Sequence, residues 1–201
     1  MPLTYQDKAE FASFKHIAGI DEAGRGPWAG PVVASAVILP TGYTHPDIND
    51  SKTISEDQRE QLFNIIMKDA LAVGIGIIDA PTIDRTNILK ATKQAMMQAL
   101  VNLSVKPDFL LIDAVKLEQI DIPQQALIKG DALALPIAAA SIIAKVTRDR
   151  IMREYHRHHP EYRFDLHKGY GTKRHQAELD QHGPIPDWHR FSYRPIKKYV
   201  K

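Results

Sequence analysis

Two kinds of apolar pattern alternate along this chain of 201 residues. The first is a short apolar run bounded by glycine, proline or polar residues, which is typical of buried strands. Such runs predict strands at residues 17–20, 31–39, 72–78, 109–113 and 126–129. The stretch between the first two, residues 21–30, is polar and rich in glycine, so we expect a loop there.

The second pattern repeats apolar residues with helical spacing. Ser55 and Gln58 have the spacing of a capping box, which predicts a helix that runs from there to about Leu71. Further helices are predicted at residues 87–103, at 137–155, where an alanine-rich stretch turns basic, and at 172–181. Strands followed by helices that alternate with more strands favour an α/β fold, with a mixed sheet flanked by helices.

The length fits one domain over residues 1–201, with residues 1–16 as an N-terminal extension. We expect the C-terminal helical segment, from about residue 155 to 201, to pack alongside the sheet. There is no cysteine, which excludes a disulfide framework and fits a reducing compartment. Neither a signal peptide nor a membrane-length apolar run is present. We therefore expect a cytoplasmic protein, and its size favours a monomer.

The net charge of +2 is unevenly distributed. Residues 1–140 contain 12 Lys and Arg against 17 Asp and Glu, a balance of −5, whereas residues 141–201 contain 14 against 7, a balance of +7. Seven of the nine histidines also lie in the second part. The asymmetry indicates an anionic partner for the C-terminal part, although a solvated basic surface would give the same pattern.

Four acidic residues follow apolar runs, where a purely structural acid would be poorly placed. They are Asp21, Glu22, Asp113 and Asp131. A carboxylate is costly to bury unless it is paired, hydrogen-bonded or bound to a cation. If the three strand ends converge, these acids supply the oxygen ligands that Mg²⁺ or Mn²⁺ prefers, and two such ions can promote phosphodiester hydrolysis.

A single acid or histidine in such a position can also have a purely structural role. Aspartate after a strand is often a helix N-cap or a turn former, although three separate strand ends make that role less fitting for the whole set. His156 and His159 are three residues apart and could bind zinc from one helical face. A polar helix end is the simpler interpretation, since histidine near a helix C-terminus interacts favourably with the helix dipole.

Around the first two acids the chain resembles a known family. The stretch IAGIDEAGRGPWAGPVVASAVIL, residues 17–39, resembles the N-terminal signature of ribonuclease HII. Six further blocks are similar to segments of that family and follow in its order: DSK at 50–52, LLIDAVKL at 110–117, IKGD at 128–131, AAASIIAKVTRDR at 138–150, HKGYGT at 167–172 and HRFSYRPI at 189–196. A glycine-rich string alone would be weak, whereas seven ordered blocks form a strong signal.

The resemblance implies a ribonuclease H-like fold and an endonuclease that acts on the RNA strand of RNA–DNA hybrids. It also implies cutting 5′ of single ribonucleotides embedded in duplex DNA, which leaves 3′-OH and 5′-phosphate ends, with a role in ribonucleotide removal and primer degradation. The catalytic carboxylates, which would hold Mn²⁺ or Mg²⁺, fall on Asp21, Glu22, Asp113 and Asp131.

The resemblance also assigns residues that recognise the substrate. The family's GRG motif falls on Gly24, Arg25 and Gly26 and is understood to sense the ribonucleotide 2′-OH through backbone groups. Glycine permits such close approach, and the 2′-OH separates RNA from DNA. The family's tyrosine falls on Tyr170, whose ring would pack against the sugar of the next nucleotide. A half-buried core tyrosine is the structural alternative.

Basic residues in or beside the matching blocks are candidates for contact with phosphates, because such cations give sequence-independent affinity. These candidates are Lys52, Lys145, Arg148, Lys168 and Arg190. Ser141 would either hydrogen-bond a phosphate or pack within its helix, and the sequence does not choose between these. A replication clamp is a further partner for this class, although the tail carries no convincing peptide motif for one.

The sequence departs from the family pattern after the fourth carboxylate. Members often have a basic residue and a serine where this chain has Leu133 and Ala134. We expect a phosphate contact or a hydrogen bond to be missing there, which affects the fine placement of Asp131. Thr53-Ile54 also differ from the basic residue and leucine that we expect in the DSK segment.

Three rival interpretations remain at this point. Ribonuclease HIII usually lacks the arginine found here at Arg25 and carries an extra N-terminal domain, whereas about 16 residues precede the first motif here. A non-catalytic duplex-binding module would have lost carboxylates, and all four are present. Another metal-dependent nuclease is not excluded by the fold, but the GRG motif together with Tyr170 argues against it.

Overall fold

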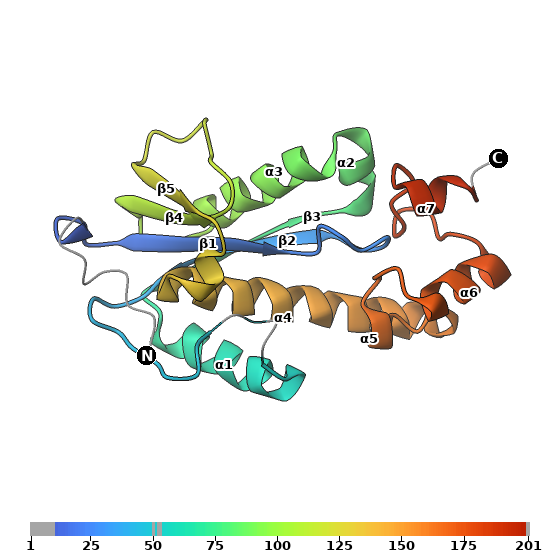
Figure 1. The fold of residues 1–201 in the computed structure, drawn as a ribbon, viewed down its shortest axis with the longest axis horizontal. Helices are drawn as coiled ribbons and strands as arrows, with labels where there is room; N and C mark the ends of the chain where they lie inside the picture. Colours follow the sequence, from blue (N-terminus) through green and yellow to red (C-terminus); the bar gives the residue numbers. More distant parts are fainter. Residues whose placement is uncertain (1–10, 50, 52–53, 200–201) are drawn as a thin grey trace.

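The computed structural model describes residues 11–49, 51 and 54–199 and contains a five-stranded mixed sheet (Figure 1). The strand order is β3-β2-β1-β4-β5. The central strand β1 is antiparallel to β2 and parallel to β4, while β3 is antiparallel to β2 and β5 parallel to β4. The strands are β1 (Ile17–Ala23), β2 (Val32–Ile38), β3 (Ala72–Ile78), β4 (Phe109–Asp113) and β5 (Gln124–Leu127).

Side-chain caps fix where the first helices begin. Ser55 and Gln58 form the predicted capping box, and Asp79 and Asn87 accept backbone hydrogen bonds at the starts of α2 and α3. The described part of the chain offers no helix with the length and hydropathy of a membrane span. The helices are α1 (Glu56–Asp69), α2 (Ala80–Arg85), α3 (Ile88–Val101), α4 (Leu135–His158), α5 (Phe164–His167), α6 (Lys173–His182) and α7 (Arg194–Lys197), and the 3₁₀ turns are η2 (Gly130–Ala132) and η3 (Pro160–Tyr162).

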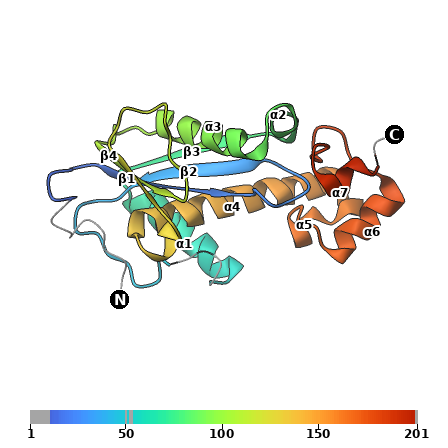
Figure 2. The same cartoon turned by 45° about the horizontal axis from the view of Figure 1, so that its top comes forward.

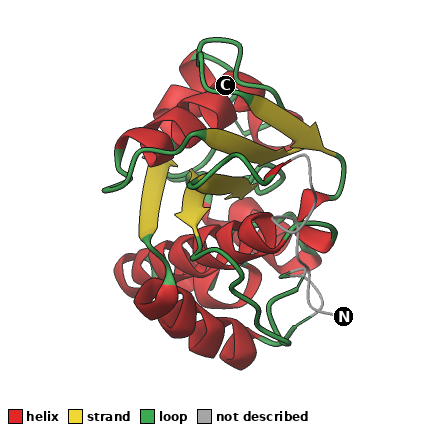
Figure 3. Ribbon diagram, turned by 90° about the vertical axis from the view of Figure 1, so that its left-hand side faces the viewer, coloured by secondary structure: helices red, strands yellow, loops and turns green. Residues whose placement is uncertain are grey.

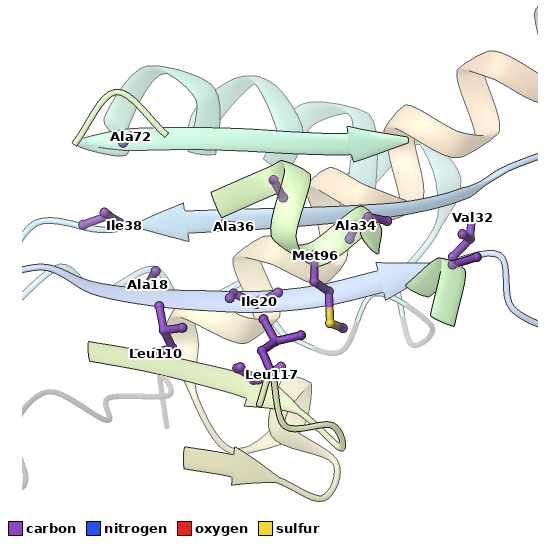
Figure 4. Packing of buried hydrophobic residues seen from close by; sticks show 14 of the residues in the cluster. Ala18, Ile20, Val32, Ala34, Ala36, Ile38, Ala72, Met96, Leu110 and Leu117 are labelled. Atoms are coloured by element: carbon purple, nitrogen blue, oxygen red, sulfur yellow. The ribbon is translucent and has the colours of Figure 1, made fainter. Parts of the chain in front are cut away.

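The sheet lies as a layer between helices (Figure 3). Alternate residues of a strand face opposite sides, so Ala34, Ala36 and Ile38 of β2 pack with Met96 of α3 (Figure 4). Val37 of β2 faces the opposite side of the sheet and packs with residues of α1 and α4 in a second cluster. Helix α4 lies so close to β1 that a Cβ on Gly19 would come within 2.0 Å of the Pro136 backbone. The long helix α4 is therefore held directly beneath the central strand.

The residues after α4 form a C-terminal lobe, defined here as residues 160–199, which lies at the far end of that helix (Figures 1 and 2). Phe164, Leu179 and Ile196 of this lobe pack with Met152 of α4 in a separate apolar cluster. The lobe also contacts the glycine-rich loop after β1, because the backbone N–H of Trp28 donates to the carbonyl of Gly169 at 2.8 Å. The lobe and the sheet therefore meet at that loop.

The predicted fold class is confirmed, and the strands at 72–78 and 109–113 have their predicted bounds. Strand β1 continues three residues beyond the predicted end, β5 begins two residues earlier than predicted, and α4 extends beyond both predicted ends. The short helices α2, α5 and α7 were not predicted, because six or four residues are too few to show a helical period. Residues 1–10 of the expected N-terminal extension lie outside the described residues.

Candidate active site

The ends of two neighbouring parallel strands carry three of the predicted acids. In β1 and β4, Ile20 lies opposite Ile112, and Asp21 and Asp113 come next in their strands. Asp21 and Glu22 lie inside β1 and remain paired with β2, so the prediction that they follow the strand is wrong. The expected convergence of β1 and β4 is present, because the two strands run in the same direction.

These three acids line one cavity of about 260 Å³. The cavity lies where β1, β4, α4, the glycine-rich loop and the C-terminal lobe come together. It therefore collects residues that are far apart in the sequence, as an active site formed by several elements does. Besides the acids, its walls are formed by Ala23, Gly24, Arg25, Gly26, Ser51, Ser141, Lys145 and Tyr170.

Asp21 is a strongly perturbed acid. It is buried, and burial together with the negative charges of Glu22 and Asp113 raises its pKa well above the usual range, although a hydrogen bond from Ser141 acts in the opposite direction. The backbone N–H of Glu22 also donates to Asp21 Oδ1 at 2.7 Å. A carboxylate crowded by other carboxylates is a common feature of catalytic and metal-binding sites.

The fourth acid lies on a turn that is tied to β4. Asp113 Oδ1 accepts a hydrogen bond from the backbone N–H of Gly130 at 2.7 Å, and Asp131 is the buried next residue in η2. Asp131 is not among the residues that line the cavity. Within the described residues, no three acidic or histidine side chains are arranged to share one metal ion. The structure thus brings three predicted carboxylates together and leaves the fourth adjacent to them through Gly130.

The residues present fit a hard divalent cation. The donors are carboxylate oxygens with hydroxyls nearby and without sulfur or imidazole, which is the ligand chemistry that Mg²⁺ and Mn²⁺ prefer. The raised pKa of Asp21 shows that negative charge at this point is costly without a counter-charge. Asp21, Glu22 and Asp113 would hold such an ion, and Asp131 is the candidate fourth ligand beside them.

The glycine-rich loop presents its backbone at the edge of the cavity. Gly24 has a φ of +98°, and a Cβ there would lie 2.1 Å from Nε of Arg148, so both its conformation and its surroundings require glycine. The side chain of Arg25 is 43% exposed and pairs with Glu22 at 3.2 Å. The loop therefore offers backbone groups together with one exposed guanidinium.

Arg190 holds this loop from the side of the C-terminal lobe. Its guanidinium donates to the carbonyls of Gly24 at 2.6 Å, Arg25 at 3.0 Å and Gly30 at 2.8 Å. Tyr193 adds a hydroxyl that donates to the carbonyl of Arg25 at 2.7 Å. Because Arg190 is fully buried, the expectation that it contacts a phosphate needs correction: it positions the loop.

Arg148 holds the same loop from α4. It donates to the carbonyls of Ala29, Pro31 and Lys168, at 3.0, 3.0 and 2.9 Å, and is also fully buried. Burial lowers its pKa to about 10, which leaves it charged at neutral pH. The expectation of a phosphate contact is corrected here too, since the backbone carbonyls occupy the guanidinium and no surface remains exposed.

The remaining predicted contacts have different surroundings. Tyr170 is 42% exposed and lines the cavity, so the alternative of a core tyrosine does not hold. Lys145 lies 5.8 Å from the centre of that ring and pairs with Asp149 at 2.7 Å. Lys168 is mostly buried, and its Nζ donates to the carbonyl of Asp165, so a direct phosphate contact is not supported for it. Lys52 lies outside the described residues.

Sequence reasoning left Ser141 open and missed Ser51. The two hydroxyls lie 2.8 Å apart in a buried position, and Ser141 hydrogen-bonds Asp21. Each carried a signal in the sequence, since Ser51 belongs to the DSK segment and Ser141 is a polar residue within an alanine-rich helix. The pair therefore supports the buried carboxylate of Asp21 through hydrogen bonds.

The histidine alternative finds no metal site. His156 Nδ1 lies 3.3 Å from Asp165 and His159 Nδ1 lies 3.1 Å from Glu161, at and just beyond the end of α4. Neither belongs to a group of potential metal ligands within the part of the chain that is described. This arrangement agrees with the simpler interpretation of a polar helix end.

The family model and the relatives similar in sequence carry the same family name. A family model described as Ribonuclease HII matches residues 18–196. Ribonuclease HII of Syntrophus aciditrophicus (strain SB) is 52% identical over 190 residues, which cover 94% of this chain and 89% of the relative. Ribonuclease HII of Bacillus anthracis (strain CDC 684 / NRRL 3495) is 51% identical over 197 residues, which cover 98% and 76%.

Solved structures agree with this assignment. The crystal structure of the ribonuclease H2 from Pyrococcus horikoshii OT3 has a TM-score of 0.75 at 26% identity and covers 92% of this chain and 96% of that one. The RNase HII in the PCNA complex from Archaeoglobus fulgidus has a TM-score of 0.74 at 26% identity and covers 89% and 95%. The resemblance inferred from seven sequence blocks is thereby confirmed. The chain belongs to the ribonuclease HII family, whose members are divalent-metal-dependent endoribonucleases.

Proposed function

We propose that this chain is an endonuclease that cuts the RNA strand of RNA–DNA hybrids and cuts 5′ of single ribonucleotides embedded in duplex DNA, leaving 3′-OH and 5′-phosphate ends. One observation carries the proposal. Three carboxylates at the ends of parallel strands, the loop at Gly24–Gly26 and the exposed ring of Tyr170 line the same cavity. Chemistry on a phosphodiester and recognition of its sugar would therefore occur within one nucleotide of each other.

The carboxylates have the metal-binding role in this proposal. Asp21, Glu22, Asp113 and Asp131 would hold Mg²⁺ or Mn²⁺. A divalent ion bound there would lower the pKa of the attacking water and neutralise charge on the scissile phosphate. Ser51 and Ser141 keep Asp21 oriented through a chain of hydroxyls, since Ser141 is hydrogen-bonded to both.

The loop and Tyr170 have the role of reading the sugar. Gly24, Arg25 and Gly26 present backbone groups that can approach a 2′-OH closely, because two of the three positions lack a side chain. Arg190 and Arg148 hold that backbone rigid from behind. Tyr170 would pack on the sugar of the following nucleotide, which is a deoxyribose at an RNA–DNA junction.

Phosphate contacts come from fewer residues than the sequence suggested. Lys145 is partly exposed at the cavity, and Arg25 is exposed at its edge, so these two are the cations best placed for the backbone of the substrate. Lys52 stays in the proposal as a sequence-based prediction. The C-terminal segment, from about residue 155 to 201, would complete the substrate groove with its excess of basic residues.

Partners other than nucleic acid are a smaller part of the proposal. A relative from Archaeoglobus fulgidus has been solved as a PCNA:RNase HII complex, so a replication clamp is a candidate partner for this chain. A monomer is the expected state on the ground of size. A cytoplasmic location is proposed from the nucleic-acid substrate together with the lack of cysteine.

The test uses a labelled DNA duplex that contains one ribonucleotide, with an all-DNA duplex as control and an RNA–DNA hybrid as a second substrate. Each is incubated with Mn²⁺, Mg²⁺ or EDTA. We expect metal-dependent cutting 5′ of the ribonucleotide and within the RNA strand, with the all-DNA control intact. Equal cutting of all duplexes would indicate a general nuclease, and undiminished cutting in EDTA would refute the metal-dependent mechanism.

A further inference from the structure

Three histidines of the C-terminal lobe lie buried directly behind Tyr170. They are His167, His175 and His189, called here the histidine cluster. The rings of His167 and His175 stack with centroids 4.4 Å apart, and His175 and His189 bring their Nε2 atoms within 3.1 Å. The proposed chemistry uses carboxylates and a tyrosine and gives this cluster no role.

The hydrogen bonds fix which nitrogen carries the proton in two of the three rings, His175 and His189. The backbone N–H of Ile185 donates to His189 Nδ1 at 2.8 Å, so the proton of His189 is on Nε2. That Nε2–H donates to His175 Nε2, which must accept. His175 therefore carries its proton on Nδ1, which lies 3.0 Å from the carbonyl oxygen of Tyr170 and donates to it.

This arrangement is a chain of donors that runs in one direction. It begins at the backbone N–H of Ile185, passes through two neutral rings and ends on the carbonyl of Tyr170. Both rings must be neutral, because a second proton on either one would set two N–H groups against each other. Burial, with the other histidines nearby, lowers the pKa of His175 to about 3, and burial lowers that of His189 to about 4, so both are neutral at pH 7.

The third histidine holds the peptide on the other side of Tyr170. The backbone N–H of Gly169 donates to His167 Nδ1 at 3.1 Å, while His167 Nε2 lies 2.9 Å from Glu178 Oε2 and 2.7 Å from the Tyr162 carbonyl. Imidazoles therefore fix the backbone both before and after Tyr170. This matters because Tyr170 is 42% exposed, so the backbone hydrogen bonds add to the contacts of its ring with Lys145 and Arg148 in defining its position.

We propose that His175, oriented by His189, is a positioning residue that sets the place of Tyr170 and thereby the preference for RNA–DNA junctions. The inference rests on the proposed role of Tyr170 in reading the sugar of the following nucleotide. His175 touches neither the substrate nor the carboxylates; it acts through one hydrogen bond to the Tyr170 carbonyl. Its loss should therefore change the choice between substrates more than the chemistry of cutting.

The experiment measures kcat/KM on two substrates, a duplex with one embedded ribonucleotide and a continuous RNA–DNA hybrid, for the full-length chain. The substrate ratio is kcat/KM for the embedded ribonucleotide divided by kcat/KM for the hybrid. In His175→Ala we expect this ratio to fall about tenfold, because a small displacement of a positioning group has effects of this size. His175→Asn keeps an N–H near the place of Nδ1 and should restore the ratio to within about threefold of wild type. His189→Gln keeps a donor near the place of Nε2, so its substrate ratio should lie closer to that of wild type than the ratio of His189→Ala does.

A matched control separates positioning from stability. Leu179→Ala removes a fully buried side chain from the same helix, α6, but keeps every hydrogen-bonding group of the donor chain. It should lower the melting temperature at least as much as His175→Ala and leave the substrate ratio unchanged. A fall in the ratio with Leu179→Ala would mean that any loosening of the lobe suffices, and the proposal would be overturned.

Tyr170→Ala distinguishes failure of this inference from failure of the proposed function. We expect Tyr170→Ala alone to lower the ratio, and His175→Ala to add nothing to it in the double variant. An unchanged ratio in Tyr170→Ala would remove the proposed role of the tyrosine, and this inference with it. A lowered ratio in Tyr170→Ala with a normal ratio in His175→Ala would overturn the positioning role alone.

Discussion

The two sides of the cavity bury titratable groups in opposite ways. On the side of the sheet, Asp21 is buried next to Glu22 and Asp113, and its pKa is raised because burial, and then the neighbouring negative charges, disfavour its ionised form. On the side of the C-terminal lobe, His175 and His189 are buried as neutral rings with their protons assigned by hydrogen bonds. The carboxylates require a counter-charge, whereas the two histidines have all their ring nitrogens hydrogen-bonded within the protein.

The difference indicates which side does chemistry and which side holds shape. Carboxylates that lie close together repel one another, and a bound cation would remove this repulsion. Such a group is therefore suited to bind a cation. Neutral imidazoles with every nitrogen used bind nothing further and instead fix a backbone. We therefore expect changes on the carboxylate side to act on cleavage and metal binding, and changes on the histidine side to act on selectivity and acid stability.

The largest effect should come from Asp21→Asn. Loss of this charge should lower kcat on the embedded ribonucleotide on the order of 10³-fold, the scale seen when one group that stabilises transition-state charge is removed. Mn²⁺ should raise the melting temperature of the wild type but not that of the variant. The matched control is Asp79→Asn, which keeps the N-cap of α2 and should behave as wild type. Equal stabilisation of both proteins by Mn²⁺ would contradict the metal-binding role of Asp21.

Arg190→Lys tests the link between the two sides. A lysine keeps the charge but cannot reproduce the fork that donates to Gly24, Arg25 and Gly30. We expect a loss of about 3 kcal/mol in the free energy of unfolding, because buried carbonyls lose their donors, together with reduced cleavage of both substrates. Urea titration measures the first quantity. The same exchange at the exposed Arg174 should be neutral, and a neutral result at Arg190 would argue against its role in holding the loop.

Acid should affect the two sides with opposite sign. The folded-state pKa of His175 and of His189 lies below the unfolded value of about 6.5, so the unfolded chain binds more protons below that pH and stability falls. Between pH 7 and pH 5 each ring should cost roughly 2 kcal/mol of unfolding free energy. Asp21, with its raised pKa, lowers the stability of the metal-free protein as the pH rises above about 4. Urea titrations in EDTA measure the free energy of unfolding at both pH values. The variant with His175→Asn and His189→Gln should lose less of it between pH 7 and pH 5 than wild type does. An equal loss in both proteins would mean that other groups cause the acid sensitivity.

The smallest effect should come from Leu133→Lys. Leu133 is 51% exposed beside η2, where the family resemblance led us to expect a basic residue, so the change adds one cation near the carboxylates without altering the core. We expect KM for the hybrid to fall by roughly threefold at low salt and the gain to fade as salt rises. The neutral variant Leu133→Gln serves as control and should show no salt-dependent gain.

The sequence predicted the fold well where burial is uniform along an element. Strand β4 is a continuous apolar run and was predicted with its full bounds, and the capping box of Ser55 located the start of α1. Strand β1 was predicted to end at Ile20 because the next two residues are acidic. In the structure backbone pairing with β2 continues through them, and such pairing does not depend on whether a side chain is apolar.

The site was predictable in its chemistry and less so in its burial. Acids and glycines were recognisable by type, since an acid is unusual directly after an apolar run and closely spaced glycines mark a loop with an accessible backbone. Arg148 and Arg190 were predicted to contact phosphates because a sequence does not show whether an arginine faces solvent or the backbone of a distant loop. The histidine cluster was missed for a similar reason: His175 and His189 are 14 residues apart, and only the lobe brings their rings together.

The hydrogen bonds of Arg190 have a consequence for how the protein is made. The loop at Gly24 is synthesised 166 residues before the guanidinium that holds it. During synthesis β1, β2 and β4 can pair before that guanidinium has emerged from the ribosome, whereas the loop proposed to read the sugar gains its support only with the segment around Arg190. The two sides of the cavity would thus form in order, the metal-binding side before the sugar-reading side.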